Sequence, residues 1–266
     1  MTFEEYFIKD YDLKDSTHYK EYISKIGLKK ASELFNYEGI SLTRVAYDNC
    51  SAMTLTTSCM DRNEYLVESL KTWLKFPFKD IIIVDWSSKK PVQESLEESL
   101  GDILKRSPTR ICIKRVDGKE YYDHSVVRNM KHDLILDKDT WVLSIDCDVK
   151  LKNNFGKYLY LTNPNKFYVN VSKRSDKGLF GTCIYHMSLY STVGGYDEDL
   201  KYWGAEDIDF YQRAILKGYT AVDIRSITME HIEHSNDLRV KNTPVRSIYE
   251  SLAKNNYKIS MKGIFQ

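Results

Sequence analysis

The chain has 266 residues, 42% of them hydrophobic and 13% aromatic, which is enough to bury the core of one large domain. The formal net charge of +1 gives no indication of a nucleic-acid partner. Its five cysteines are scattered without a Cys-x-x-Cys pair, which argues against a structural zinc site and a disulfide framework. The longest aliphatic run is Ile81–Val84, far below the roughly 18 residues of a membrane-spanning helix. Since the amino terminus also lacks a basic signal-peptide segment, the sequence predicts a cytoplasmic protein.

Residues 1–50 differ from the rest of the chain and predict a helical extension. Apolar side chains recur at approximately helical spacing at Tyr19, Ile23 and Ile26, and later at Leu34. No pattern typical of a catalytic site occurs there, so we expect the extension to pack on the main domain. Docking on a partner or a membrane surface is the alternative.

From residue 51 the pattern predicts strands that alternate with helices. We expect strands at residues 51–58, 80–88, 110–116 and 140–149, and helices at 63–74, with Asn63 as its cap, and at 125–136. This alternation with short connections predicts an α/β fold, a mostly parallel sheet with helices on both faces. Residues 241–266 are expected to form a helical tail.

Acidic residues fall at the expected strand ends, where such sheets bind ligands. Asp85 follows one strand, and Asp146 and Asp148 end another in the segment SIDCDV. If that strand persists, Asp146 and Asp148 point the same way; if the chain turns, they diverge. Two close carboxylates repel each other, which a divalent cation relieves. The alternative is an Asx turn, in which the aspartates bond to the backbone.

A second group of acids stands in the segment YWGAEDIDFYQRA, residues 202–214. It places carboxylates behind a Trp-Gly pair at the start of a predicted helix: Trp203, Gly204, Glu206, Asp207 and Asp209. Acids at a helix start are favoured by the helix dipole, so simple capping is one interpretation. Arg213 lies one turn after Asp209, so we expect these two residues to form an ion pair.

The order and spacing of these motifs, from about residue 52 to 240, resemble nucleotide-sugar glycosyltransferases of the GT-A fold. The front half resembles the large family-2 group in its segments TTSCMDRNEYLVESL, IIIVDWSS, VVRNM and SIDCDV. The rear half is similar to the module shared by β-1,4-galactosyltransferases and bacterial chondroitin polymerases. The similar segments are LFGTCIYHMSLYSTVGGYDEDLKYWGAEDIDFYQRAILKGY and HIEHSND. The resemblance implies a Rossmann-like GT-A domain at 51–240, with a nucleotide-binding half (51–150) and an acceptor and catalytic half (151–240).

The resemblance also implies a reaction and a set of acceptor-side roles. A hexose, N-acetylhexosamine or uronic acid would pass with inversion from a UDP-sugar to a saccharide acceptor, in the synthesis of a surface polysaccharide or glycoconjugate. Asp207 would be the general base. Glu206 would bind acceptor hydroxyls, and Trp203 would support a pyranose face. Gly204 would let the backbone approach the ligand.

On the donor side, the resemblance implies Mn²⁺ (or Mg²⁺) held by Asp148 and His234, with His231 as the alternative ligand. A strand over HIEHSND would send these two histidines to opposite faces. The nucleotide-sugar would contact Ser58, Cys59, Arg62, Asp85, Arg128 and Asp146. Two positions depart from the common family-2 pattern, which frequently has Asn at Asp61 and Asp-Gly at Trp86–Ser87. His124 and His186 are interpreted as structural.

The sequence leaves two alternative functions open and disfavours a third. A retaining transferase is an alternative, since a related Trp-Gly-Gly-Glu element occurs in retaining enzymes. A non-catalytic saccharide-binding subunit of a polymerase complex is another. A sugar nucleotidyltransferase is disfavoured, because the segment TSCMDRNEY after the first strand lacks glycine. We expect a saccharide acceptor, no nucleic acid, and a location in the cytoplasm or at the inner face of the membrane, with peripheral membrane association left open.

Overall fold

The computed structural model describes residues 37–170, 178–201, 203–224, 226–235, 237–238 and 241–261. The helical pattern expected between Tyr19 and Leu34 lies outside these residues. The first described element is helix α3 (Tyr37–Ser51), which leads directly into the first strand. Within the described ranges, no helix combines the length and the apolar composition that crossing a membrane requires.

A seven-stranded sheet forms the centre of the described fold, in the order β3-β2-β1-β4-β7-β6-β8. Its strands are β1 (Met53–Cys59), β2 (Asp80–Trp86), β3 (Arg110–Val116), β4 (Trp141–Ser144), β6 (Lys166–Val169), β7 (Cys183–His186) and β8 (Thr220–Asp223). Strands β3, β2, β1 and β4 run parallel to one another, as do β6 and β8, whereas β7 runs antiparallel to β4 and β6. The expected α/β fold with a mostly parallel sheet is confirmed.

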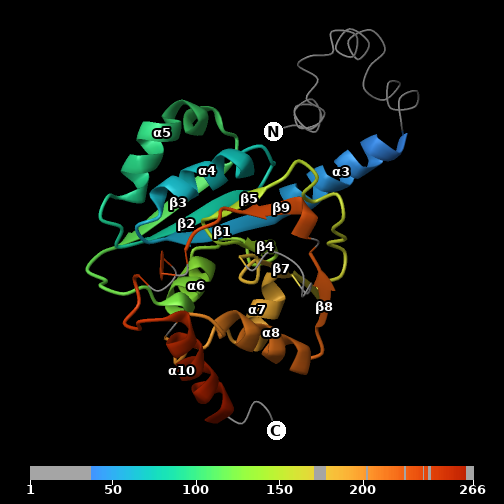
Figure 1. Ribbon diagram of the computed structural model, residues 1–266. Helices are drawn as coiled ribbons and strands as arrows, with labels where there is room; N and C mark the ends of the chain where they lie inside the picture. The colour runs from blue at the N-terminus through green and yellow to red at the C-terminus, as the bar shows by residue number, and fades with distance from the viewer. Residues whose placement is uncertain are drawn as a thin grey trace.

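Helices cover both faces of this sheet. They are α4 (Asn63–Trp73), α5 (Val92–Arg106), α6 (His124–Asp133), α7 (Met187–Val193), α8 (Glu206–Leu216) and α10 (Ile248–Met261). Helices α4 and α5 lie on one face, and α6, α7 and α8 lie on the other (Figure 1). A short 3₁₀ helix, η2 (Ser226–Thr228), follows β8.

The central strand β2 shows why the sequence specifies these two layers. Its aliphatic side chains alternate between faces: Ile81 and Ile83 join the core cluster that includes α4 and α5, while Ile82 and Val84 face the opposite side. A strand covered on both sides must be apolar at every position, which explains the uninterrupted run at 81–84.

Two local predictions were wrong. The strand expected at 140–149 ends at Ser144, and the chain turns before β5 (Val149–Leu151), so Asp146 and Asp148 lie on the turn. Asn63 does not cap α4, because Arg62 occupies the cap position without a side-chain bond. The Asn63 amide instead donates to the Lys90 carbonyl (2.9 Å) and the Ser95 hydroxyl (2.7 Å), where α5 begins.

A separate two-stranded sheet pairs β5 with β9 (Met229–His231) in antiparallel register. Val149 lies opposite His231, and the Ile232 N–H donates to the Asp148 carbonyl at 2.7 Å. This pairing brings the turn after β4 beside a segment more than 80 residues later in the chain.

Candidate functional site

A cavity opens at the carboxyl ends of β1 and β4, where α8 begins, as the parallel-sheet rule predicts. Most of the site residues expected from the sequence line it: Ser58, Arg62, Arg128, Asp146, Asp148, Trp203, Gly204, Glu206, Asp207 and His231. His234 joins the same site through its contact with Asp148. The fold therefore brings together residues from both halves of the expected domain.

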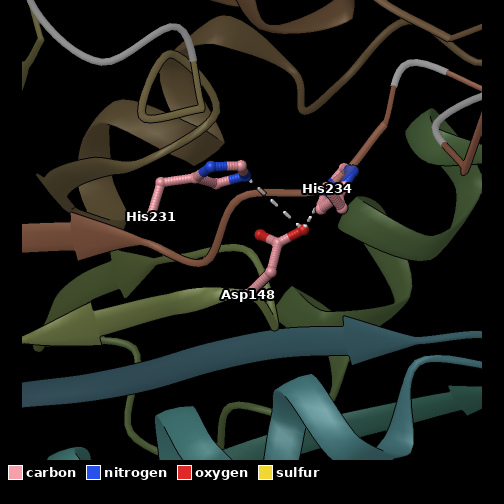
Figure 2. Close-up of side chains that lie close together, drawn as sticks. All are labelled: Asp148, His231 and His234. Atoms are coloured by element: carbon pink, nitrogen blue, oxygen red, sulfur yellow. Dashed lines mark hydrogen bonds and ion pairs between the residues drawn. The ribbon is translucent and has the colours of Figure 1, made fainter.

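Asp148 and the two histidines form one cluster (Figure 2). The Asp148 Oδ2 atom lies 2.9 Å from His234 Nε2 and 3.8 Å from His231 Nε2, and the three ligand atoms lie within 4.8 Å of one another. The expectation that the histidines face opposite ways was wrong, because β9 ends at His231 and the chain then leaves strand geometry. One carboxylate oxygen and two imidazole nitrogens form a donor set that suits Mn²⁺.

The charge state of Asp148 also suits a cation. Burial raises the pKa of this carboxyl, but the hydrogen bond with His234 and the charge of Arg62 outweigh burial and lower it. Arg62 donates to Asp148 Oδ2 at 3.0 Å and to the Leu238 carbonyl at 2.8 Å. The carboxylate is therefore ionised at neutral pH and fixed in position.

Two glycines leave the space that these side chains occupy. A Cβ atom on Gly178 would lie 2.1 Å from His231 Cγ, and one on Gly181 would lie 2.7 Å from Asp146 Oδ2 and 2.9 Å from Arg128 Nη2. Neither contact is sterically tolerable, so both positions require glycine while the neighbouring side chains stay in place.

The acids of the second motif are buried at the first turn of α8. Glu206 is 3% exposed and Asp207 9%. They follow two successive left-handed residues, Gly204 (φ 83°) and Ala205 (φ 77°), a conformation that a non-glycine residue adopts only at a cost in energy. This tight turn starts the helix at the cavity wall.

Helix α10 anchors that turn from behind. The Ser251 hydroxyl donates to the Trp203 carbonyl at 2.7 Å, and the Asn255 amide donates to the Gly204 carbonyl at 2.6 Å. A Cβ atom on Gly204 would lie 2.8 Å from Leu252 Cδ2, so α10 and the turn are in close contact.

Arg128 lies between the two motifs. Its Nε atom is 3.4 Å from Glu206 Oε1, and its Nη2 atom is 3.6 Å from Asp146 Oδ1. Burial and the charge of Glu206 together raise the pKa of Asp207 to about 7, although the charge of Arg128 opposes the shift. Burial likewise raises the pKa of Glu206. This part of the cavity can therefore take up a proton near neutral pH.

Asp209 is fully buried and forms an ion pair within α8. Its Oδ2 atom lies 2.7 Å from Arg213 Nη2, so the expected ion pair one turn along α8 is confirmed. Asp209 does not line the cavity.

Two expected nucleotide residues lie outside the cavity lining. The Asp85 carboxylate accepts hydrogen bonds from the N–H groups of Ser88 and Val92, both at 3.0 Å, and from Arg115. It thereby satisfies backbone donors at the start of α5. The Cys59 thiol is buried and donates to Asn63 Oδ1 at 3.4 Å.

Sequence reasoning missed the loop between β3 and α6. Tyr122 from this loop and His124, the first residue of α6, line the cavity, and the Tyr122 hydroxyl lies 2.5 Å from Ser58 Oγ. No motif marks the segment DGKEYYDH, but it follows a strand at the same edge of the sheet as the other site residues. That position was the available signal.

Comparisons with known proteins find similar sequences and similar folds. Residues 166–237 match the family model described as the N-terminal domain of galactosyltransferase. Chondroitin sulfate synthase 3 of Homo sapiens is 29% identical over 127 residues, covering 37% of this chain and 14% of that protein. The Mus musculus protein of the same name is 37% identical over 59 residues, covering 22% of this chain and 7% of that protein. The chain thus spans only a small part of these relatives.

Two solved structures share the fold. The S. aureus TarS 1–349 structure in complex with UDP has a TM-score of 0.52 and 15% identity, and the match covers 78% of this chain and 71% of that chain. The mannosyltransferase PcManGT from Pyrobaculum calidifontis, in complex with GDP-Man and Mn²⁺, has a TM-score of 0.50 and 14% identity, covering 65% and 54%.

The fold is therefore that of the GT-A glycosyltransferases, as the motif order predicted. Within this fold, residues 166–237 are similar to the galactosyltransferase family model, and part of the chain is similar to chondroitin sulfate synthase 3.

The raised pKa of Asp207 predicts an effect of pH on stability. An acid whose pKa is raised from 3.8 to about 7 by folding destabilises the folded state increasingly as pH rises through that interval. We expect Asp207→Asn to become more stable than the wild type by roughly 1–3 kcal/mol as pH rises from about 4 to 7. Melting curves across this range measure the difference.

Asp209→Asn is the matched control for this measurement. It removes a buried acid that is paired with Arg213, so it should lose stability at neutral pH where the Asp207 variant gains it. A difference between Asp207→Asn and the wild type that does not change with pH would contradict the interpretation.

Proposed function

We propose that this protein is a metal-dependent, inverting glycosyltransferase that moves a hexose, an N-acetylhexosamine or a uronic acid from a UDP-sugar to a saccharide acceptor. The observation that carries the proposal is that one cavity contains both the Asp148–His231–His234 cluster and the buried Glu206–Asp207 pair. A cation site for a nucleoside diphosphate and a base for an acceptor hydroxyl are the two groups that this reaction needs.

On the donor side, Asp148, His231 and His234 would hold Mn²⁺, or Mg²⁺ in its place. A bound divalent cation neutralises the negative charge that develops on the departing diphosphate. Arg62 lies beside the cluster, and Arg128 lies deeper in the cavity. We assign both to the diphosphate. Asp146 contacts the ribose or orients water on the cation, and Ser58 lies at the nucleoside end.

On the acceptor side, Asp207 accepts the proton of the attacking hydroxyl. A pKa of about 7 suits this role, because a general base works best when its pKa is close to the working pH. Among the described residues, the buried Glu206 Oε2 atom has no hydrogen-bond partner, so we assign it as the acceptor for a sugar hydroxyl. Trp203 lines the cavity beside these acids and offers a flat surface to a pyranose ring.

A non-catalytic saccharide-binding subunit would not require this arrangement. Burying Glu206 and Asp207 together raises the pKa of both carboxyls and destabilises the fold at neutral pH. A surface that only binds sugar gains nothing from a proton acceptor tuned to pH 7.

The proposed domain comprises residues 51–240, with a nucleotide-binding half (51–150), an acceptor half (151–240), the extension before it and the tail after it. We place its reaction in surface-saccharide synthesis, in the cytoplasm or at the inner face of a membrane.

The first prediction of this proposal concerns the metal. Asp148→Asn, His231→Ala and His234→Ala should each weaken Mn²⁺ binding by about tenfold or more, because each removes one ligand. Titration calorimetry in the presence of UDP measures this loss, and EDTA should abolish transfer. His186→Ala is the control, since His186 contacts Asp139 and Ser188 away from the cluster. Unchanged Mn²⁺ affinity in all three variants would refute the cation site.

The second prediction concerns the base. Asp207→Asn should lower kcat by roughly a hundred- to ten-thousand-fold and leave UDP and Mn²⁺ affinity intact, because the amide keeps the size and loses the basicity. Glu206→Gln should raise the acceptor KM more than it lowers UDP affinity. In the wild type, kcat/KM should fall as pH drops below about 7 and Asp207 is protonated. Transfer by Asp207→Asn within a few-fold of the wild type would exclude it as the base.

The third prediction concerns the nucleotide. We expect UDP to bind more tightly than GDP in the presence of Mn²⁺, because the motifs around Ser58 and Arg62 resemble those of UDP-sugar enzymes. Calorimetry with both nucleotides decides the question. Tighter GDP binding would assign the protein to a different donor.

A further inference from the structure

His124 lies in the cavity but has no part in the proposed mechanism. It is the first residue of α6, its side chain is 18% exposed, and it lines the cavity together with Tyr122. Its Nδ1 atom lies 3.6 Å from Glu206 Oε1. A histidine this close to the acceptor-side carboxylate can fix the direction in which that carboxylate points.

We propose that His124 is a positioning residue for Glu206: its Nδ1–H points at Oε1 and thereby keeps Oε2 turned toward the acceptor hydroxyl. The expected effect on catalysis rests on the proposed function. The contact between His124 and Glu206 does not depend on that function. His124 itself touches neither the transferred proton nor the donor in this scheme.

The contacts of Glu206 support this division between its two oxygens. Oε1 receives both neighbours, Arg128 Nε at 3.4 Å and His124 Nδ1 at 3.6 Å. Oε2 is buried and has no hydrogen-bond partner among the described residues. Both contacts to Oε1 are longer than a good hydrogen bond, and such contacts commonly shorten when a substrate completes the site. Oε2 is therefore the oxygen whose hydrogen-bonding capacity is unsatisfied, and we assign it to the acceptor hydroxyl.

The proton on His124 follows from its surroundings. Burial and the charge of Arg128 together lower the pKa of His124 to about 3, so the ring is neutral at pH 7. A neutral imidazole has one N–H, and an ionised carboxylate only accepts hydrogen bonds. The proposal therefore places the hydrogen on Nδ1, the nitrogen that faces Glu206.

The imidazole is held in place from the nucleotide end of the cavity. The Tyr122 ring packs edge-on against it, with ring centroids 4.6 Å apart. Tyr122 is fixed in turn by its hydroxyl contact with Ser58 (2.5 Å) and by its backbone N–H, which donates to the Asn242 carbonyl (2.6 Å). A continuous set of contacts thus links Ser58, beside the expected nucleoside, to Glu206.

Three substitutions separate positioning from packing. His124→Phe keeps the ring and removes the donor, His124→Asn places an amide N–H near the Nδ1 position, and His124→Gln places it near Nε2. We expect His124→Phe and His124→Gln to raise the acceptor KM by about tenfold, as the loss of one hydrogen bond to a charged group predicts. His124→Asn should restore most of the wild-type KM. UDP affinity and melting temperature, measured on the same variants, report on folding and on the donor side.

Equal acceptor KM values for His124→Phe and His124→Asn would overturn the proposal, as would an acceptor KM in His124→Phe that matches the wild type. A rise in the acceptor KM together with an equal loss of UDP affinity would assign His124 a packing role instead.

The tautomer of His124 tests the inference without any enzyme activity. In ¹⁵N-histidine NMR spectra at pH 7, we expect His124 as the Nδ1–H form, and Glu206→Gln should change its shifts. His186 is the internal reference for the opposite tautomer, because its Nδ1 accepts from the Ser188 N–H at 3.3 Å. An Nε2–H form of His124 would refute the positioning role. If the wild type shows the Nδ1–H form but transfers no sugar from any UDP-sugar, the proposed function fails and the geometry stands.

Discussion

The buried guanidinium of Arg128 is the constraint on which the cavity depends. A cation that is 5% exposed must be surrounded by partners, because an unpaired buried charge is strongly destabilising. Its partners come from separate parts of the fold: Asp146 on the turn after β4, Glu206 at the start of α8, and the carbonyl of Gly181 at 3.3 Å. Its guanidinium also lies 5.4 Å from the centre of the Tyr196 ring. Satisfying this one charge fixes the relative positions of the donor and acceptor sides.

The site is assembled at the expense of stability. Ala205 adopts a left-handed conformation that alanine rarely takes, and the adjoining acids are buried, which raises the pKa of both. Such features persist where the surrounding structure determines them, here through Arg128 on one side and α10 on the other. The same burial that destabilises Asp207 as a carboxylate gives it the basicity that the proposed proton transfer needs.

The sequence predicted the features that depend on local periodicity. The strand β2 and the helix α6 could be predicted from the periodicity of their apolar residues. The rule that ligands bind at strand ends located Asp146 and Asp148 at the site. The turn after Ser144 could not be predicted from the sequence, since the residues that follow also suit a longer strand. The convergence of His231 and His234 on Asp148 depends on the pairing of β5 with β9, which no local pattern reveals. His124 was interpreted as structural because a single histidine in a sequence usually belongs to a packed or surface position.

The contacts of α10 have a consequence for the order in which the protein matures. Strand β8, the last strand of the central sheet, ends at Asp223, whereas the side chains that hold the Trp203–Gly204 turn are Ser251 and Asn255. During synthesis the sheet and its two hydrophobic layers can therefore form on the ribosome before the acceptor side is fixed. A chain that ended before Ile248 would contain every strand of the central sheet but would lack the side chains that anchor the Trp203–Gly204 turn.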